Sequence, residues 1–280
     1  MKVSVALLVL MVVLPMAFGQ LKVGFYDSSC PNAEAIVKQV VQKRFNTDKS
    51  VTAALLRMHF HDCFVNGCDA SLLINSTDAE KDAGQNFSVR GFDLIDAVKE
   101  SLEDACPSTV SCADIITLAT RDAVALAGGP KYEVPTGRRD GLVSRSSDVD
   151  LLGPGISVQN ALDFFADKGI KRQDMVSLMG AHTVGKAHTR AKPSGQFLDA
   201  KTPFVVDNQY YKEILRGNGV LSIDQNLAVS SLTRSIVTAR ASNTTNFQTS
   251  FANAMIKMGQ IQVLTGNAGE IRKKCSAFNN

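Results

Sequence analysis

The chain has 280 residues, with 30 Lys and Arg against 27 Asp and Glu, and its formal net charge of +3 is spread along the sequence. The sequence has no basic cluster of the kind that binds nucleic acid, so nucleic acids are excluded as partners and only a mild attraction to acidic polysaccharide is expected. The length suits one large globular domain or two lobes, and we expect a soluble monomer without membrane contact.

The N-terminus has the pattern of a secretory signal peptide. One charge, Lys2, precedes a predominantly apolar run from Val3 to Phe18, and the run ends at the small residue Gly19. A membrane-spanning helix needs about 20 apolar residues and a stop-transfer flank, whereas this run is shorter and stands at the extreme N-terminus. We therefore interpret residues 1–19 as a cleaved signal peptide and residues 20–280 as the mature, secreted chain.

Apolar spacing along the mature chain is mostly that of helices, and signals for strands are few. Glycine and proline clusters separate the helical stretches, and we expect long loops around residues 65–91 and 129–156. The expected fold class is therefore all-α. The predicted helices cover residues 33–45, 51–64, 92–104, 112–127, 157–168, 173–188, 208–216, 225–240 and 246–259.

The predicted helix over residues 51–64 carries the first candidate site. Arg57 and His61 are four residues apart, so their side chains project from one face. A cation and an imidazole on one face form either an ordinary surface pair or a catalytic pair of fixed charge and base. The spacing fits both interpretations.

The predicted helix over residues 173–188 carries the second candidate. Met175, Leu178, Met179 and His182 follow helical spacing, which places the imidazole on an apolar stripe that faces the core. Such a histidine is either a core residue with satisfied hydrogen bonds or a ligand of a metal or haem iron. In the second case its other ring nitrogen needs a carboxylate or carbonyl partner.

A zinc site around His59, His61 and Cys63 is a weaker alternative. Residues two apart on a helix diverge by about 200°, so the two imidazoles do not face one ion. Cys63 is also better suited to pair with Cys68, because a short loop containing Asn66-Gly67 brings the two close.

The secretory signal makes disulfides the default interpretation of the cysteines. Six cysteines allow 15 connectivities, so spacing alone does not pair them, and only the short loop from Cys63 to Cys68 suggests a bridge. The other cysteines are Cys30, Cys106, Cys112 and Cys275.

The segment over residues 62–71 concentrates hard oxygen ligands around a tight turn. Asp62, Asp69 and the Ser71 hydroxyl lie within ten residues, and the turn exposes backbone carbonyls. Calcium prefers such ligands, while ordinary turn and cap chemistry explains the same residues without an ion.

Long segments of the sequence resemble the class III plant peroxidases. LLRMHFHDCFVNGCDASLL at residues 55–73 resembles their distal-helix signature, and MGAHTVG at residues 179–185 resembles their proximal-haem signature. The agreement follows the family's order over nearly all of the mature chain. Further matching segments are FYDSSCPNAE (25–34), EKDAGQN (80–86), RGFDLID (90–96), VSCADI (110–115), VPTGRRDG (134–141), DNQYY (207–211) and SIDQNL (222–227).

This resemblance implies the haem peroxidase fold, with haem b between a distal lobe of about residues 20–150 and a proximal lobe of about residues 151–280. His182 would be the axial ligand of the haem iron, and Asp224 would accept its other ring proton. The roles implied on the opposite face of the haem are His61 as base, Asn86 as the group that fixes its tautomer, Arg57 as charge stabiliser and Phe60 as a packing residue.

The resemblance also implies two calcium ions, three disulfides and a buried pair of Asp114 with Arg138. The implied distal calcium ligands are Asp62, Val65, Gly67, Asp69 and Ser71, with Glu80 reaching the ion through water. The implied proximal ligands are Thr183, Asp199, Thr202, Val205 and Asp207. The implied disulfides are Cys30–Cys106, Cys63–Cys68 and Cys112–Cys275.

The sequence departs from the family between His182 and Asp199. Only 16 residues lie between the two, where the family carries a much longer segment with a further cysteine bridge. Leu152 stands at the donor-binding position where the family usually has proline, and Tyr132 stands where tryptophan is common. The departure leaves the peroxide-cleaving residues in place and affects the region through which donors approach.

The implied activity is reduction of hydrogen peroxide to water with one-electron oxidation of small phenolic donors, in the cell wall outside the cell. Sequons at Asn75 and Asn243 are expected to carry glycans, whereas the sequon at Asn86 lies beside the implied base. The alternative is a catalytically impaired or non-functional haem-peroxidase-like protein from a shortened transcript or gene model, for which the missing segment is the argument.

Overall fold

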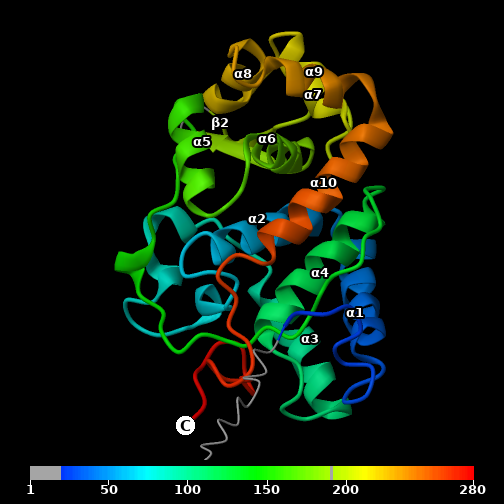
Figure 1. Ribbon diagram of the computed structural model, residues 1–280, viewed down its shortest axis with the longest axis vertical. Coiled ribbons are helices and arrows are strands. Elements are labelled where there is room, and N and C mark those ends of the chain that lie inside the picture. Colours follow the sequence, from blue (N-terminus) through cyan, green and yellow to red (C-terminus); the bar gives the residue numbers. More distant parts are fainter. Residues whose placement is uncertain (1–19, 190–191) are drawn as a thin grey trace, which may run out of the picture.

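The computed structural model of the chain describes residues 20–189 and 192–280 (Figure 1). The predicted signal peptide, residues 1–19, lies outside the described residues. The described chain is mainly helical, as expected. Its α-helices are α1 (Ala33–Thr47), α2 (Val51–Cys63), α3 (Phe92–Ala105), α4 (Cys112–Leu126), α5 (Val158–Asp167), α6 (Arg172–Met179), α7 (Gln209–Leu215), α8 (Ser222–Val229), α9 (Arg234–Ser242) and α10 (Thr244–Met258).

Short elements connect these helices and position several candidate side chains. Single 3₁₀ turns occur at η1 (Ser71–Leu73), η2 (Glu80–Asp82), η3 (Gly84–Asn86), η4 (Ser146–Asp148) and η5 (Gly180–Thr183). The two strands are β1 (Lys186–Thr189) and β2 (Lys192–Phe197), which pair antiparallel as a hairpin.

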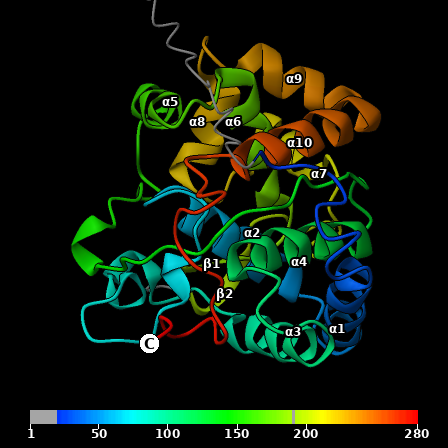
Figure 2. The ribbon, with the colours of Figure 1, turned by 60° about the horizontal axis from the view of Figure 1, so that its bottom comes forward.

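Helices α1 to α4 lie in the lower half of Figure 1, α5 to α9 lie in the upper half, and α10 runs from one half to the other. The view in Figure 2 likewise groups α1, α3 and α4 away from α5, α8 and α9. The tail after α10 returns to the lower half, where the Cys68 amide donates to Ile261 O (3.0 Å) and the Glu270 amide donates to Asp140 O (2.9 Å). The division into lobes at residues 150 and 151 stays a prediction.

Helix α4 is the central helix of the lower half. Its N-cap Ser111 accepts a hydrogen bond from the amide of Asp114 (3.1 Å), which satisfies one free donor of the first turn. Most of its residues are buried, because α1, α2 and α3 all pack against it. A helix that is apolar on nearly all sides belongs in such a position.

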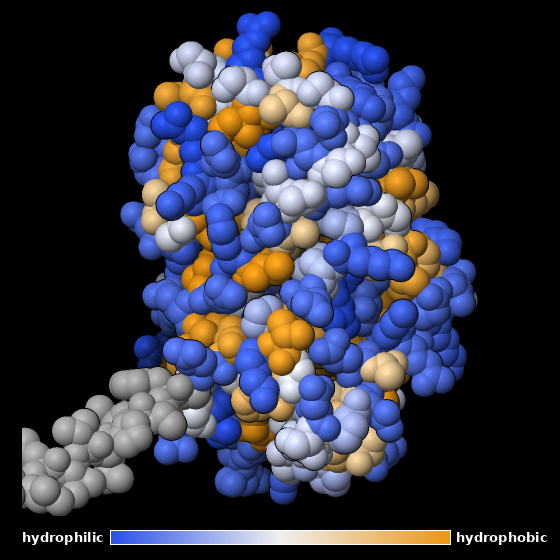
Figure 3. All heavy atoms as spheres, turned by 45° about the vertical axis from the view of Figure 1, so that its right-hand side comes forward, coloured by the Kyte–Doolittle hydropathy of each residue, from blue (hydrophilic) through white to orange (hydrophobic). Residues whose placement is uncertain are grey.

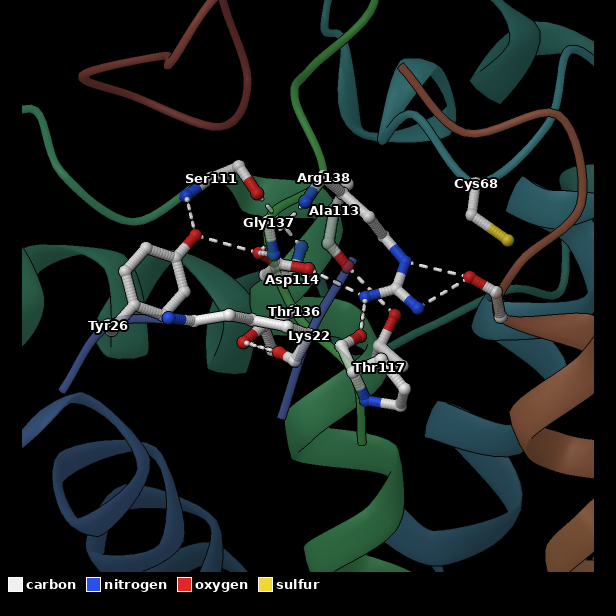
Figure 4. Close-up of polar contacts among 12 residues, drawn as sticks. Lys22, Tyr26, Cys68, Ser111, Ala113, Asp114, Thr117, Thr136, Gly137 and Arg138 are labelled. Carbon is white, nitrogen blue, oxygen red and sulfur yellow. Dashed lines mark hydrogen bonds and ion pairs between the residues drawn. The ribbon is translucent and has the colours of Figure 1, made fainter. Parts of the chain in front are cut away.

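A buried ionic network fixes the segment that follows α4 (Figure 4). Arg138 and Asp114 form an ion pair at 2.7 Å with side chains that are almost inaccessible. Tyr26 donates to the same carboxylate at 2.7 Å, and Arg138 Nε donates to Gly259 O at 2.8 Å. The network therefore joins the N-terminal segment, α4, the chain at residue 138 and the end of α10.

Three disulfides close the described chain: Cys30–Cys106, Cys63–Cys68 and Cys112–Cys275. They are the pairings that the family resemblance implied. The bridge from Cys112 to Cys275 spans 163 residues and ties the C-terminal tail to the start of α4. Bridges of this kind stabilise a fold mainly by restricting the unfolded chain, by about 2–4 kcal/mol each.

The predicted helix over residues 173–188 is wrong in its second half. Helix α6 ends at Met179, the chain tightens into η5, and strand β1 begins at Lys186. Gly180 is closely covered, because an added Cβ would lie 2.5 Å from the Tyr211 hydroxyl. Gly185 has a φ of +98°, a left-handed conformation that ends helical geometry and suits glycine.

The predicted helix over residues 225–240 is two helices in the structure. Helix α8 starts earlier, at Ser222, and ends at Val229, and α9 begins at Arg234. Between them the Thr233 hydroxyl donates to Leu227 O (2.7 Å). This bond satisfies a carbonyl near the end of α8 and allows the chain to change direction.

Strands β1 and β2 form a hairpin in the stretch where the sequence is expected to be shorter than the family it resembles. Lys186 pairs with Phe197 and Ala187 pairs with Gln196, and the Leu198 amide donates to Gly185 O (3.1 Å). This pairing reverses the chain immediately after η5. It therefore returns Asp199 to the neighbourhood of Thr183.

None of the helices in residues 20–189 and 192–280 has the length and apolarity needed to cross a bilayer. Apolar side chains on the face in Figure 3 form small patches separated by polar ones. Single exposed apolar residues are normal on proteins and imply no partner.

Candidate active site

Helix α2 brings the first pair of candidate residues together. Arg57 Nε donates to His61 Nε2 at 3.1 Å, one helical turn away. The guanidinium also donates to Gln85 O at 3.1 Å, which holds it against the loop before α3. The helix spacing explains the pair, and the loop contact adds an anchor that the spacing does not predict.

Asn86 fixes the other side of the His61 ring. His61 Nδ1 lies 2.6 Å from Asn86 Oδ1, and Asn86 Nδ2 donates to Glu80 O at 2.6 Å. Because the amide oxygen is an acceptor, the ring proton is on Nδ1. Nε2 then carries a lone pair, which suits a base.

The surroundings of His61 keep its ring neutral. Burial lowers the pKa of His61 to about 4, and the positive charge of Arg57 acts in the same direction, while the bond to Asn86 opposes both. The imidazole is therefore unprotonated at neutral pH and able to accept a proton.

His182 lies in η5 and is held by a buried carboxylate. His182 Nδ1 is 2.8 Å from Asp224 Oδ1, and Asp224 is almost fully buried in the first turn of α8. Burial lowers the pKa of His182, but the charge and hydrogen bond of Asp224 outweigh burial and raise it. With Nδ1 occupied, Nε2 is the nitrogen left to bind a metal ion.

Tyr210 completes this group and was not assigned a role from the sequence. Its hydroxyl donates to Asp224 Oδ1 at 2.8 Å, the same oxygen that His182 uses. The two rings meet edge to face with centroids 6.0 Å apart. The segment DNQYY was part of the family resemblance, but no sequence signal linked this hydroxyl to Asp224.

Phe60 belongs to an aromatic cluster beside His61. Its ring centroid lies 4.4 Å from that of Phe64 and 5.9 Å from that of Phe165 on α5. Phe60 is only partly buried, so one part of its ring stays available for contact. The cluster connects α2 with α5 and supports the face that carries His61.

The loop after α2 contains an uncompensated group of buried acids. Asp62 Oδ1 and Glu80 Oε2 are buried without a hydrogen-bond partner, and Asp69 accepts from the Ser71 hydroxyl at 2.5 Å. Burial and mutual repulsion raise the pKa of Asp62 well above its usual range, and burial raises that of Glu80 to about 7. Such a group suits a hard cation.

The carbonyl groups of Val65 and Gly67 were expected to bind an ion at this loop. Lys168 Nζ donates to Val65 O at 2.8 Å, which uses one of the two lone pairs of that oxygen. Gly67 has a φ of +95° and is pressed against Gln262, so only glycine fits there.

A second group of oxygens surrounds Thr183, the residue after His182. The Thr183 hydroxyl lies 3.3 Å from Asp199 Oδ2, Val205 O and Asp207 Oδ1. The Thr202 hydroxyl lies 2.9 Å from Asp199 and 3.1 Å from Asp207. All five expected proximal ligands therefore converge, although the chain before Asp199 is short.

The zinc alternative fails because its cysteine sulfurs are oxidised. Among the described residues, ligand atoms of His59, Cys63 and Cys68 lie within 4.8 Å of one another. The two sulfurs are joined in a disulfide, so neither is a thiolate ligand. His59 packs away from His61, with its Nε2 3.4 Å from the Thr117 hydroxyl.

Leu152 is half-buried against the core at the start of the upper half. It precedes Gly153 and Pro154, and Pro154 O accepts from the Ile223 amide next to Asp224 (3.3 Å). The loop that carries Leu152 is thus attached to the N-terminus of α8.

Comparison with known proteins identifies the family. The family model described as Peroxidase matches residues 37–243. Peroxidase 57 of Arabidopsis thaliana is 53% identical over 305 residues, covering 98% of this chain and 97% of the relative. Peroxidase 44 and Peroxidase 28 of the same organism are 53% and 50% identical, with 95% and 98% of this chain covered.

The alignment with one of these relatives is longer than the chain itself. The alignment with Peroxidase 57 runs over 305 positions, whereas this chain has 280 residues, so at least 25 aligned positions (305 less 280) are missing here. The helical fold, the family model and the relatives all indicate the same family. The chain belongs to the peroxidase family, as a plant class III peroxidase, and is an oxidoreductase of a family that uses haem.

Proposed function

We propose that the protein reduces hydrogen peroxide to water and oxidises small phenolic donors in one-electron steps, with haem b bound between His61 and His182. The observation that carries the proposal is the pair of oriented imidazoles: His61 is held by Asn86, and His182 is held by Asp224. In each ring Nδ1 donates to an oxygen atom, and among the described residues no oxygen acceptor is bonded to Nε2.

The residues fit the cofactor by their chemistry. Haem iron takes a neutral imidazole whose second nitrogen donates to a carboxylate, and Asp224 supplies that carboxylate to His182. His182 remains about 29% exposed although its carboxylate partner is buried, so its ring is open to a ligand. When bound, haem supplies the redox chemistry, and the chain positions the reactants.

The distal residues act on the peroxide itself. His61 Nε2 accepts a proton from one peroxide oxygen and returns it to the other as water leaves. Asn86 holds the Nδ1 proton during both transfers, so the ring does not change tautomer. Arg57 stabilises the negative charge that develops as the O–O bond breaks, because its guanidinium is always protonated.

We also infer two calcium ions. The distal ion would neutralise Asp62 and Asp69 and reach Glu80 through water, with the Val65 and Gly67 carbonyls and Ser71 completing its ligands. The proximal ion would replace the crowded hydroxyl contacts around Thr183. The proximal ligands are Thr183, Asp199, Thr202, Val205 and Asp207.

The donor site and the location are further parts of the proposal. Leu152 would contact phenolic donors near the haem edge. Oxidised cysteines and the predicted signal peptide support secretion to the cell wall. A weak affinity for acidic wall polysaccharide follows from the positive net charge.

The test is the absorption spectrum of the protein reconstituted with haem and calcium, before and after one equivalent of hydrogen peroxide. We expect a Soret band that shifts within seconds and returns when a phenol is added. His182→Ala is expected to lose the band, and His61→Ala is expected to keep it while reacting with peroxide at least about 100-fold more slowly.

The same experiment separates the impaired alternative. A parent protein without a Soret band, or with a band indifferent to peroxide, would mean that the missing segment is needed for the reaction. His61→Ala reacting at the parental rate would contradict the role of His61 even if the parent is active.

A further inference from the structure

The acceptor oxygen of Asp224 is shared by two donors. His182 Nδ1 and the Tyr210 hydroxyl both lie 2.8 Å from Asp224 Oδ1. Both Asp224 and Tyr210 are almost completely buried, at 1% exposure each, so water does not compete for these bonds. In such surroundings a hydrogen bond to a charged acceptor is strong.

Tyr210 is a permanent donor. A tyrosine phenol carries its proton at neutral pH and a carboxylate oxygen only accepts, so the Tyr210 hydroxyl is the donor in its 2.8 Å contact with Asp224 Oδ1. Each bond to one carboxylate oxygen withdraws electron density from that oxygen. The phenol therefore weakens the ability of Asp224 to attract the Nδ1 proton of His182.

From this geometry we propose that Tyr210 is a positioning residue that tunes the proximal ligand by sharing Asp224 Oδ1 with His182. The inference rests on the proposed function, because it acts through an iron-bound His182. A carboxylate that pulls strongly on Nδ1–H makes the imidazole more anionic and favours the ferric state. Tyr210 limits this pull and so raises the reduction potential.

The position of Tyr210 also links two parts of the site. It lies in the first turn of α7, three residues after Asp207, whose carboxylate faces Thr183. Asp207 Oδ1 accepts from the Gln209 amide at 2.8 Å at the start of the same helix. The oxygen cluster around Thr183 therefore sets the place of α7, and α7 sets the place of the phenol.

The test compares Tyr210→Phe with Tyr211→Phe in the haem-reconstituted full chain. Tyr211 is a matched control because its hydroxyl is also buried and also donates to oxygen, to Val176 O at 2.8 Å and Ser177 O at 3.2 Å, and does not donate to Asp224. The measurements are the ferric–ferrous midpoint potential by spectroelectrochemistry and the iron–histidine stretching frequency by resonance Raman spectroscopy.

We expect Tyr210→Phe to shift the potential to more negative values and the stretching frequency upward, with the Soret band retained. Tyr211→Phe is expected to leave both values close to those of the parent. An unchanged potential in Tyr210→Phe, or an equal shift in both variants, overturns the inference.

The proposed function fails in a different way. A parent protein that shows no iron–histidine stretch, or His182→Ala that keeps the parental spectrum, would show that His182 is not the ligand. A His182-ligated parent with an unresponsive Tyr210→Phe would contradict only the role of Tyr210.

Discussion

At the scale of single residues, the candidate site consists of side chains whose protonation is set by their neighbours. His61 is neutral because burial and Arg57 disfavour the charged ring, and its bond to Asn86 decides which nitrogen carries the proton. His182 experiences the opposite balance, because Asp224 outweighs burial. The pKa values of two histidines in one chain are therefore shifted in opposite directions by their surroundings.

The pKa of His61 predicts an acid limit for the peroxide reaction. His61 accepts a proton only when neutral, so the rate constant should be flat from neutral pH down to about pH 5 and fall about tenfold per unit below its pKa of about 4. Stopped-flow measurement of the peroxide-dependent Soret change tests the profile.

Arg57→Leu provides the control for this profile. It removes a positive charge beside the ring and the contact to Nε2, so the pKa of His61 should rise and the fall should begin at higher pH. The absolute rate should also decrease, because developing charge loses its partner. A fall that starts at the same pH in both proteins would contradict the influence of Arg57 on His61.

At the scale of elements, buried links between segments far apart in sequence hold the site-bearing helices. The Arg138–Asp114 pair joins α4 to the end of α10 through Gly259 O (Figure 4). The same end of α10 contacts the Cys63–Cys68 loop, because Met258 O lies 3.1 Å from Cys68 Sγ. The loop that follows α2 is therefore backed by α10.

Asp114→Ala is expected to destabilise the protein by about 3–5 kcal/mol, because it leaves the guanidinium of Arg138 buried without a counter-charge. Equilibrium denaturation in urea measures the change. Asp93→Ala is the matched control: its ion pair with Arg44 is equally short, at 2.6 Å, but the Asp93 side chain is 69% exposed.

The control should change stability by less than about 1 kcal/mol, because solvent screens exposed pairs. Equal losses in the two variants would mean that burial does not decide the strength of these pairs.

At the scale of the whole molecule, the folded chain holds several acidic side chains in its interior. Asp62, Asp69 and Glu80 meet in one loop, and the pKa of each is raised by burial. Without a cation these carboxyl groups bind protons in the folded state at a pH at which they ionise in the unfolded chain. Folding then takes up protons.

Calcium removal should therefore make stability depend on pH. The pKa of Glu80 rises from 4.5 to about 7 on folding, so the folded state binds more protons between these values. The thermal midpoint in excess chelator should decrease as the pH rises from about 4.5 to about 7, and excess calcium should restore it at neutral pH. Differential scanning calorimetry measures both effects.

Glu80→Gln removes one of these titrating groups and should flatten the slope measured in chelator. A chelated protein whose midpoint increases over the same pH range would contradict the burial of protonated carboxyl groups in this loop.

The sequence determined the family resemblance, the predominance of helix and the pairing of Arg57 with His61, because side chains four apart on a helix share a face regardless of tertiary context. The other predicted ligands were placed only through the motifs that resemble the family. The helix predicted through residue 188 was wrong beyond Met179, since helical apolar spacing does not register how closely Tyr211 covers Gly180.

The tertiary structure brings together distant groups that spacing along the chain does not connect. Asp224 reaches His182 from 42 residues away, and Asn86 reaches His61 from 25 residues away. The sequence does not predict the hydrogen bond from Tyr210 to Asp224. The packing of α7 against α8 brings the phenol to the carboxylate, and spacing along the chain does not. Likewise, the return of Asp199 to Thr183 depends on hairpin pairing, a long-range contact that local propensity does not encode.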